Sequence, residues 1–269
     1  MVPHARIVLI ALGTTALLAA ATNAWQPEDA ASSLAMQQAD RARVPVLVEL
    51  FTSEGCSSCP PADALLRDLI SSQPVDGAFV IGLSEHVDYW NRLGWTDPFS
   101  DQAFSARQSA YAAAVRSGEV YTPQMIVDGA ASFVGSNRNQ ALREIAAAAA
   151  RSKATIALGW VDDGQLDVRL SGGRVKTNTP VWMAITEDGL TVRVPRGENA
   201  ARTLTHDGVT RRLTQAGRTD KAGAFSMTLA VHLDNGWKAG ATRVTVFTQQ
   251  AGGPVTALGS IRLTTARPY

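Results

Sequence analysis

The chain has 269 residues and a formal net charge of +1 at pH 7. A chain of this length is longer than most single compact domains and could form two domains. The near-neutral charge excludes the basic surface that nucleic acid or an anionic membrane would require, so we expect no nucleic-acid partner. Hydrophobic residues make up 45% and charged residues 18% of the chain, which is the balance of a globular protein.

The N-terminus has the pattern of an export signal. A short basic stretch, 1–6, precedes an apolar run over 7–21 that is rich in Ala and Leu, and small residues follow as far as Ala24. This pattern predicts a signal peptide over 1–24, cleaved after Ala21 or Ala24. The alternative is an uncleaved membrane anchor, but the run is shorter than the ~20 residues that span a bilayer. We therefore expect a periplasmic or secreted protein with no stable membrane span after cleavage.

The sequence predicts a linker or short helix over 25–43, followed by alternating strands and helices as far as residue 151. Apolar runs at 44–51 and 79–83 predict buried strands that pair in parallel, joined by a helix whose apolar face recurs over 62–70. A second helix is expected over 99–115. Asp128-Gly129 predicts a hairpin, and a helix from about 139 to 151 follows it.

From about residue 154 the pattern changes to short alternating runs. Seven such runs lie between residues 156 and 263, and Asp163-Gly164 and Asp188-Gly189 have the composition of hairpin turns. This pattern predicts a mostly antiparallel β domain over 153–269, and its strand spacing favours a sandwich.

The only two cysteines, Cys56 and Cys59, lie between the first strand and the first helix. A disulfide between them would close a loop too short to remove much unfolded-state entropy. Redox chemistry or metal binding therefore explains the pair better than a structural staple does, although an inert bridge remains open. Cys56 begins a helix, where the helix dipole favours a thiolate, and Glu54 opposes that effect.

Residues 46–151 resemble the thioredoxin superfamily. The resemblance is carried by the strand that leads into Cys-x-x-Cys at a helix start, by Thr122-Pro123 before a later strand, and by a hairpin and a terminal helix. Nearly the whole mature chain resembles a bacterial secreted family known as domain of unknown function 1223. That likeness is carried by V-E-L-F-T-S-E-G-C-S-S-C-P-P-A-D, H-V-D-Y-W-N-R-L-G-W-T-D-P-F, V-Y-T-P-Q-M-I-V-D-G and the segment 197–206. The fold expected from it is an α/β thioredoxin-like domain over 44–152 followed by the sandwich-like β domain.

The superfamily resemblance implies roles for five residues. Cys56 would be the nucleophile and Cys59 the resolving thiol. Pro123 matches the superfamily's cis-proline, and the backbone of Thr122 would pair with a bound peptide; the alternative is an ordinary trans-proline. Glu49 would be the buried acid that serves the resolving cysteine, or else a paired strand residue.

His86 and three aromatic residues follow the second strand, on the edge where the disulfide is expected. His86 would tune Cys56, carry a proton or join a metal site, unless it is structural. Tyr89, Trp90 and Trp95 would line a peptide groove or pack between the two domains.

The function expected from these residues is thiol–disulfide exchange with a thiol- or disulfide-containing protein, without a cofactor or a resident metal. One alternative is a Cu(I)-handling protein, because thiolates prefer that ion. Another is a non-catalytic envelope binding module with a residual disulfide.

Overall fold

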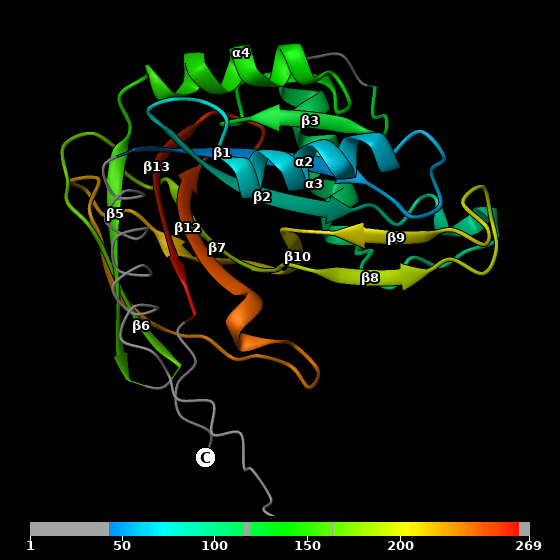
Figure 1. The fold of residues 1–269 in the computed structure, drawn as a ribbon. Coiled ribbons are helices and arrows are strands. Elements are labelled where there is room, and N and C mark those ends of the chain that lie inside the picture. The colour runs from blue at the N-terminus through cyan, green and yellow to red at the C-terminus, as the bar shows by residue number, and fades with distance from the viewer. Residues whose placement is uncertain (1–42, 116–118, 163, 264–269) are drawn as a thin grey trace, which may run out of the picture. The chain divides into compact units, whose positions relative to one another are not determined.

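The computed structural model describes residues 43–115, 119–162 and 164–263 (Figure 1). In the first half of the chain the elements are β1 (Val44–Thr52), α2 (Pro60–Ser72), β2 (Ala78–His86), the 3₁₀ helix η1 (Asn91–Leu93), α3 (Gln102–Ala114), β3 (Gln124–Val127), β4 (Ala131–Val134) and α4 (Arg138–Ala149). The second half consists of β5 (Ala154–Asp162), β6 (Gln165–Leu170), β7 (Pro180–Glu187), β8 (Leu190–Arg193), β9 (Thr203–His206), β10 (Val209–Arg218), β11 (Phe225–Ala230), the 3₁₀ helix η2 (Ala239–Ala241), β12 (Thr242–Gln249) and β13 (Val255–Arg262).

Strands from both halves of the chain belong to one sheet. Eleven strands of the described residues pair in the order β11-β6-β5-β13-β12-β7-β10-β2-β1-β3-β4, and β8 and β9 form a separate two-stranded sheet. The described residues hold 13 strands but only three α-helices, so the fold is mostly β. The prediction of an α/β thioredoxin-like domain followed by a separate sandwich-like β domain is therefore wrong.

The two halves join where β10 runs parallel to β2. Val209 lies opposite Ser84, and the Ser84 N–H donates a 2.7 Å hydrogen bond to the carbonyl of Gly208. One apolar cluster also crosses the joint, formed by buried side chains of β1, β2, β7, β12 and β13: Leu47, Phe79, Ile81, Leu83, Ala184, Phe247, Val255 and Leu258. A continuous run of apolar residues indicates that a strand is buried on both faces, but it does not show which strands pair with it. The sequence pattern therefore could not reveal that β2 has a partner from the second half.

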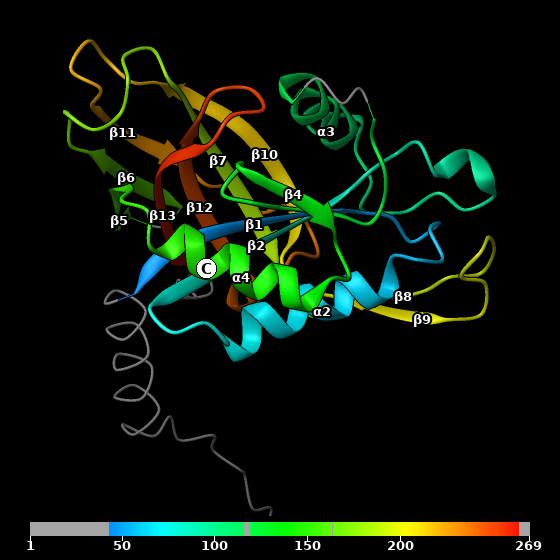
Figure 2. The ribbon, with the colours of Figure 1, turned by 90° about the horizontal axis from the view of Figure 1, so that it is seen from above.

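The helices cover both faces of β1 and β2 (Figure 2). On one face α2 and α4 pack over Val46, Val48 and Leu50. On the other face Tyr111 of α3 meets Phe51, with ring centroids 6.1 Å apart. Because successive side chains of a strand point to opposite faces, each residue near the end of β1 faces either α2 or α3.

Several local predictions are confirmed and one is wrong. β1 and β2 are parallel, and β3 and β4 form a hairpin around Asp128 and Gly129, both of which have positive φ. The hairpin next to Gly164 joins β5 and β6. The hairpin predicted at Asp188-Gly189 is wrong, because β8 pairs with β9 while β7 pairs with β10 and β12.

The signal peptide predicted over 1–24 and nearly all of the segment 25–43 lie outside the described residues. The chain boundaries at 44–152 and 153–269 stay a prediction. Within the described ranges, no helix combines the length and the apolar character needed to cross a bilayer.

The close contact between β10 and β2 predicts that a methyl group at Gly208 lowers the stability of the protein. Gly208 has φ +64°, and a Cβ there would lie 2.9 Å from the carbonyl oxygen of Gly82. Gly189 has φ +70° and nothing within 4 Å of such a Cβ. Left-handed backbone costs an L-residue about 1–2 kcal/mol at either position. We expect Gly208→Ala to lower the free energy of unfolding by a further ~1–3 kcal/mol relative to Gly189→Ala, because only Gly208 is crowded.

Urea unfolding of both variants measures this difference. Equal losses of stability would show that the backbone contact at the joint does not constrain the fold.

Candidate functional site

Cys56 and Cys59 form a disulfide at the start of α2. The motif follows β1 directly, Cys59 is the N-cap residue of α2, and the two Cα atoms lie 5.4 Å apart. Pro60 and Pro61 occupy the first turn of the helix, where backbone N–H groups have no intrahelical partner. The disulfide therefore lies between the end of a buried strand and the N-terminus of a helix, as the position of the motif predicted.

The disulfide is covered. Cys56 and Cys59 are both 0% exposed, and only Ser57 and Ser58 between them reach the surface. A nucleophilic Cys56 at a helix start would be expected to be exposed to its substrate, so the burial of its side chain differs from what that role implies.

The cover comes from the other half of the chain, in the connection between β8 and β9. The buried Asn199 amide donates 2.9 Å hydrogen bonds to the carbonyls of Glu54 and Cys56, and Arg202 donates to its oxygen at 2.8 Å. Glu198 accepts a 2.9 Å hydrogen bond from the backbone N–H of Ser57. Hydrogen bonds from Ser57 also lower the pKa of Glu198. We call residues 197–202 the cover loop.

The Thr122-Pro123 turn lies against the same part of α2. The peptide bond between them is cis, which confirms that prediction. A Cβ built on Gly135 would lie 3.1 Å from Pro123 and 3.2 Å from Ala62, which places the proline beside the first turn of α2. The side chain of Thr122 accepts a 2.8 Å hydrogen bond from Trp90.

The three aromatic residues are partly exposed, and two of them, Trp90 and Trp95, contact the loop before Cys56. Tyr89 donates to Gln108, and Trp95 donates a 2.7 Å hydrogen bond to Glu54. Trp90 lies 3.2 Å from the position of a Cβ on Gly55. Their role as a peptide groove stays a prediction, and each of them also has a structural contact.

Glu49 lies on the face of β1 opposite α2. Its carboxylate accepts hydrogen bonds from Arg107 at 2.6 Å and from Tyr111 at 2.5 Å, both of them residues of α3. Glu85 shares this site, and burial raises its pKa well above the ordinary value, with Arg107 opposing the rise. This placement matches the paired strand residue that the sequence left open, and it does not favour the predicted role of Glu49 at Cys59.

His86 lies at the end of β2 and pairs with a carboxylate. Its Nδ1 is 2.7 Å from Asp97, which also accepts the N–H of Glu54 at 2.8 Å. Burial alone would lower the pKa of His86, but Asp97, Asp63 and Glu54 outweigh it and raise that pKa above 6.5. At Asp97, burial would raise the pKa. The charge and hydrogen bond of His86 and two backbone N–H groups outweigh burial, so the pKa of Asp97 is lowered.

His206, at the end of β9, lies next to His86. The two rings are 4.9 Å apart and meet edge to face. One ring nitrogen of His206 is 3.4 Å from Glu54 and the other is 3.9 Å from Asp63. Both histidines and the three carboxylates are at least 93% buried, since Asp63, the most exposed, is 7% exposed. We call Glu54, Asp63, His86, Asp97 and His206 the acid–histidine cluster.

The sequence analysis missed three members of this cluster, Asp63, Asp97 and His206, and of these Asp63 lies nearest to the motif in the sequence. It lies one helical turn after Cys59 on α2, so the two side chains share a helix face. Thr52 donates a 2.8 Å hydrogen bond to it, and burial raises its pKa while His206 and His86 oppose the rise. The signal available in the sequence was the spacing of four residues between Cys59 and an acid in the first turn of the helix.

No group of three or more His, Cys, Asp or Glu among the described residues has the geometry to hold a metal ion. The Cu(I) alternative therefore gains no support from the arrangement of side chains.

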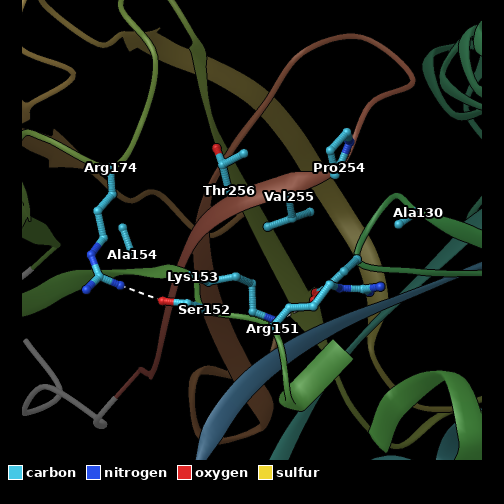
Figure 3. Close-up of a pocket in the computed structure, with 10 residues that line it drawn as sticks. Ala130, Arg151, Ser152, Lys153, Ala154, Arg174, Pro254, Val255 and Thr256 are labelled. Atoms are coloured by element: carbon cyan, nitrogen blue, oxygen red, sulfur yellow. Dashed lines mark hydrogen bonds and ion pairs between the residues drawn. The ribbon is translucent and has the colours of Figure 1, made fainter. Parts of the chain in front are cut away.

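A hollow of about 170 Å³ lies elsewhere and contains none of the predicted site residues (Figure 3). Arg151, Lys153 and Arg174 contribute its positive charge, and Lys153 pairs with Asp128. Cations after the C-terminus of α4 offset the negative end of the helix dipole, which accounts for Arg151 and Lys153 without a ligand.

Comparison with known proteins places this geometry in a family. The model of the family described as "Protein of unknown function (DUF1223)" matches residues 47–249. The chain belongs to the DUF1223 family. This assignment names the relatives of the chain and not its activity.

Two solved structures resemble the DUF1223 chain. Protein AGR_C_4864 from Agrobacterium tumefaciens is 25% identical with a TM-score of 0.68, over 84% of this chain and 98% of that one. HBP35 of Porphyromonas gingivalis is 13% identical with a TM-score of 0.57, over 84% of this chain and 77% of that one, and shows a likeness of fold alone. None of the curated proteins compared with the chain matches it.

The cover loop predicts how fast the disulfide of this DUF1223 protein is reduced. In Asn199→Ala the carbonyl of Glu54 loses its Asn199 donor, and the carbonyl of Cys56 keeps only the N–H of Cys59, so we expect dithiothreitol to reduce the disulfide faster. The free energy of unfolding should fall by about 1–3 kcal/mol, the usual cost of leaving buried polar groups unpaired. Thiol release against time and urea unfolding measure the two effects.

Asn137→Ala is the matched control. Asn137 caps α4 through a hydrogen bond to the N–H of Gln140, so its loss costs about 1 kcal/mol without touching the cover loop. An equal acceleration of reduction in both variants would mean that general destabilisation, and not the cover loop, controls access.

The contact between His86 and Asp97 leads to a prediction about the pKa of His86. The imidazole of His86 should titrate above pH 6.5 in nitrogen-15 NMR spectra. In Asp97→Asn the neighbouring charge is lost while burial remains, so the pKa of His86 should fall below that of the wild type. A raised pKa stabilises the folded protein fully below pH 6.5, and this contribution is lost as pH rises through the raised value. An unchanged titration in Asp97→Asn would refute the assignment.

Proposed function

We propose that this protein is a thiol–disulfide oxidoreductase that works through Cys56 and Cys59. The observation that carries the proposal is their disulfide, which lies at the N-terminus of α2 with a sequence separation of three. So short a loop contributes little to stability, because the entropy removed from the unfolded chain grows with loop length. A bond in this position is better suited to being opened and closed.

The proposed reaction is an exchange with a dithiol of a substrate protein. One substrate thiolate attacks the sulfur of Cys56, the bond to Cys59 breaks, and Cys59 leaves with the electron pair. The second substrate thiol then loses its proton and attacks the mixed disulfide, which expels Cys56 as a thiolate. The substrate is oxidised by two electrons. Cys56 and Cys59 are reduced and take up the two protons that the substrate thiols lost, one before the first attack and one before the second.

The helix start favours this chemistry. Unpaired N–H groups and the helix dipole at the N-terminus of α2 stabilise a thiolate. The residues beside the motif suit a polypeptide substrate: Thr122 would offer its backbone, and Tyr89, Trp90 and Trp95 would offer aromatic contacts. Both cysteines are buried, and the cover loop is hydrogen-bonded to the backbone of Cys56 and Ser57, so the proposed exchange requires a local opening that exposes Cys56.

We further propose that the reaction takes place outside the cytoplasm. The pattern over 1–24 is that of a signal peptide, and disulfides persist in the periplasm and in secreted proteins. The thiol- or disulfide-containing partner would then be an envelope or secreted protein.

Exchange assays on the purified mature chain test the proposal. We expect the wild type to speed the oxidation of a reduced, unfolded test protein and the reduction of insulin by dithiothreitol. Cys56→Ser should abolish both activities. Cys59→Ser should form a mixed disulfide that mass spectrometry detects, because the resolving thiol is missing.

The double variant Cys56→Ser/Cys59→Ser is the control for uncatalysed exchange. A wild type no faster than this variant, with its own disulfide intact, would contradict the proposal and favour a binding module with a residual disulfide.

A further inference from the structure

The eleven-stranded sheet ends in an open edge at β11. Among the described strands only β6 pairs with β11, and it does so along all six residues of the strand (Figure 2). The backbone N–H and C=O groups on the outer side of β11 therefore have no strand partner in the described part of the chain. Such an edge is a template for pairing with another chain.

The sequence of β11 lacks the features that protect an edge strand. Proteins shield such strands with charged side chains, proline, a bulge or a very short length. The strand Phe225–Ala230, F-S-M-T-L-A, has no charge and no proline, and its ladder with β6 has no register shift. The opposite edge of the sheet, β4, is only four residues long. β11 is therefore the edge better suited to pairing.

Met227 of this edge is exposed although its neighbours on the same face are covered. Phe225, Met227 and Leu229 share one face of β11, because successive side chains of a strand alternate. The residues opposite them on β6 are all buried in the core of the second half: Leu170, Val168 and Leu166. Phe225 is 7% exposed, but Met227 is 44% exposed. A further strand paired with β11 would cover this side chain.

The strand is also complementary to itself. In an antiparallel pair, residues directly opposite each other lie on the same face of the sheet. A two-fold axis at Met227 would bring the two copies of that side chain together. The same axis places Phe225 opposite Leu229 on the apolar face. It places Ser226 opposite Thr228 on the other face, where their hydroxyls form a stabilising cross-strand pair.

We propose that β11 is the interface of a homodimer, in which two copies of this chain pair their β11 strands antiparallel about a two-fold axis at Met227. Each copy contributes the same strand, so the contact is closed and assembly stops at two copies. A single strand pair buries less surface than a standard protein interface, so the dimer is weak and forms as the protein concentration rises.

The dimer leaves the disulfide accessible to the same extent as the monomer does. β11 and β1, the strand that leads into Cys56, lie toward opposite ends of the sheet. We therefore expect dithiothreitol to reduce the disulfide at one rate in both forms. The interface does not depend on the proposed function, and the two proposals fail separately.

Sedimentation velocity of the purified mature chain over a range of concentrations tests the interface. We expect a reversible equilibrium between monomer and dimer. Met227→Lys should raise the dissociation constant of the dimer by about tenfold or more, because like charges directly opposite each other destabilise a strand pair. An unchanged rate of disulfide reduction by dithiothreitol would show that this variant is folded.

Val134→Lys is the matched control, since Val134 is an exposed apolar residue of the other edge strand, β4. It should leave the dissociation constant unchanged. A wild type that stays monomeric at every concentration, or that forms assemblies larger than a dimer, would overturn the proposal. An equal effect of the two lysine variants would overturn it as well.

A cross-link tests the register and does not depend on the lysine variants. The native cysteines form one disulfide, so in Met227→Cys the introduced cysteine is the only free thiol. Directly opposite residues have Cβ atoms about 4.5–5.5 Å apart, so mild oxidation should link two copies of Met227→Cys. Val134→Cys should stay unlinked under the same conditions. If Met227→Cys remained unlinked at a concentration where the wild type is dimeric, the two-fold axis at Met227 would be refuted.

Discussion

The backbone contact between Gly208 and Ser84 is the constraint on which the site depends. It joins β10 to β2, and a histidine lies close to the contact on either side: His206 at the end of β9 and His86 at the end of β2. His206 precedes Gly208 by two residues, and His86 follows Ser84 by two. Fixing the joint therefore brings the two rings within 4.9 Å of each other, although 120 residues separate them in the chain.

The same joint places the cover loop. β9 ends at His206, so the hairpin of β8 and β9 is anchored immediately before the contact with β2. Arg67 of α2 holds the hairpin through the carbonyl of Thr205, at 3.1 Å. From these two anchors the loop reaches back to the disulfide, where Asn199 binds the carbonyl of Cys56. The second half of the chain thus supplies part of the site itself.

Two groups of buried charges lie on opposite faces of β1 and β2 and are built differently. On the α3 face, Arg107 compensates Glu49 directly, and burial favours a neutral Glu85. On the α2 face, the acid–histidine cluster contains three carboxylates and two imidazoles, but only His86 and Asp97 form a close pair. A closely paired buried charge is held in one protonation state, whereas loosely paired acids and imidazoles can change theirs.

The sequence predicted the local parts of the site well. The motif, the strand before it and the helix after it follow from short patterns, because a strand or a helix start is determined by neighbouring residues. The cis bond at Pro123 was expected from the resemblance to the thioredoxin superfamily. The same patterns could not show that β2 pairs with β10, since pairing depends on residues more than 120 positions away. For that reason the sequence did not point to Asn199 and His206 as site residues, and the predicted fold class was wrong.

Glu49 illustrates the limit at a single residue. A buried acid on β1 was expected to serve Cys59, and a buried acid is present there, but alternation along the strand turns its side chain toward Arg107 and Tyr111. The acid on the face of the disulfide is Asp63, which is carried by the helix and not by the strand. Its position relative to Cys59 is set by the helical repeat, so inserting one residue between the two would turn the acid away from the helix face that carries Cys59.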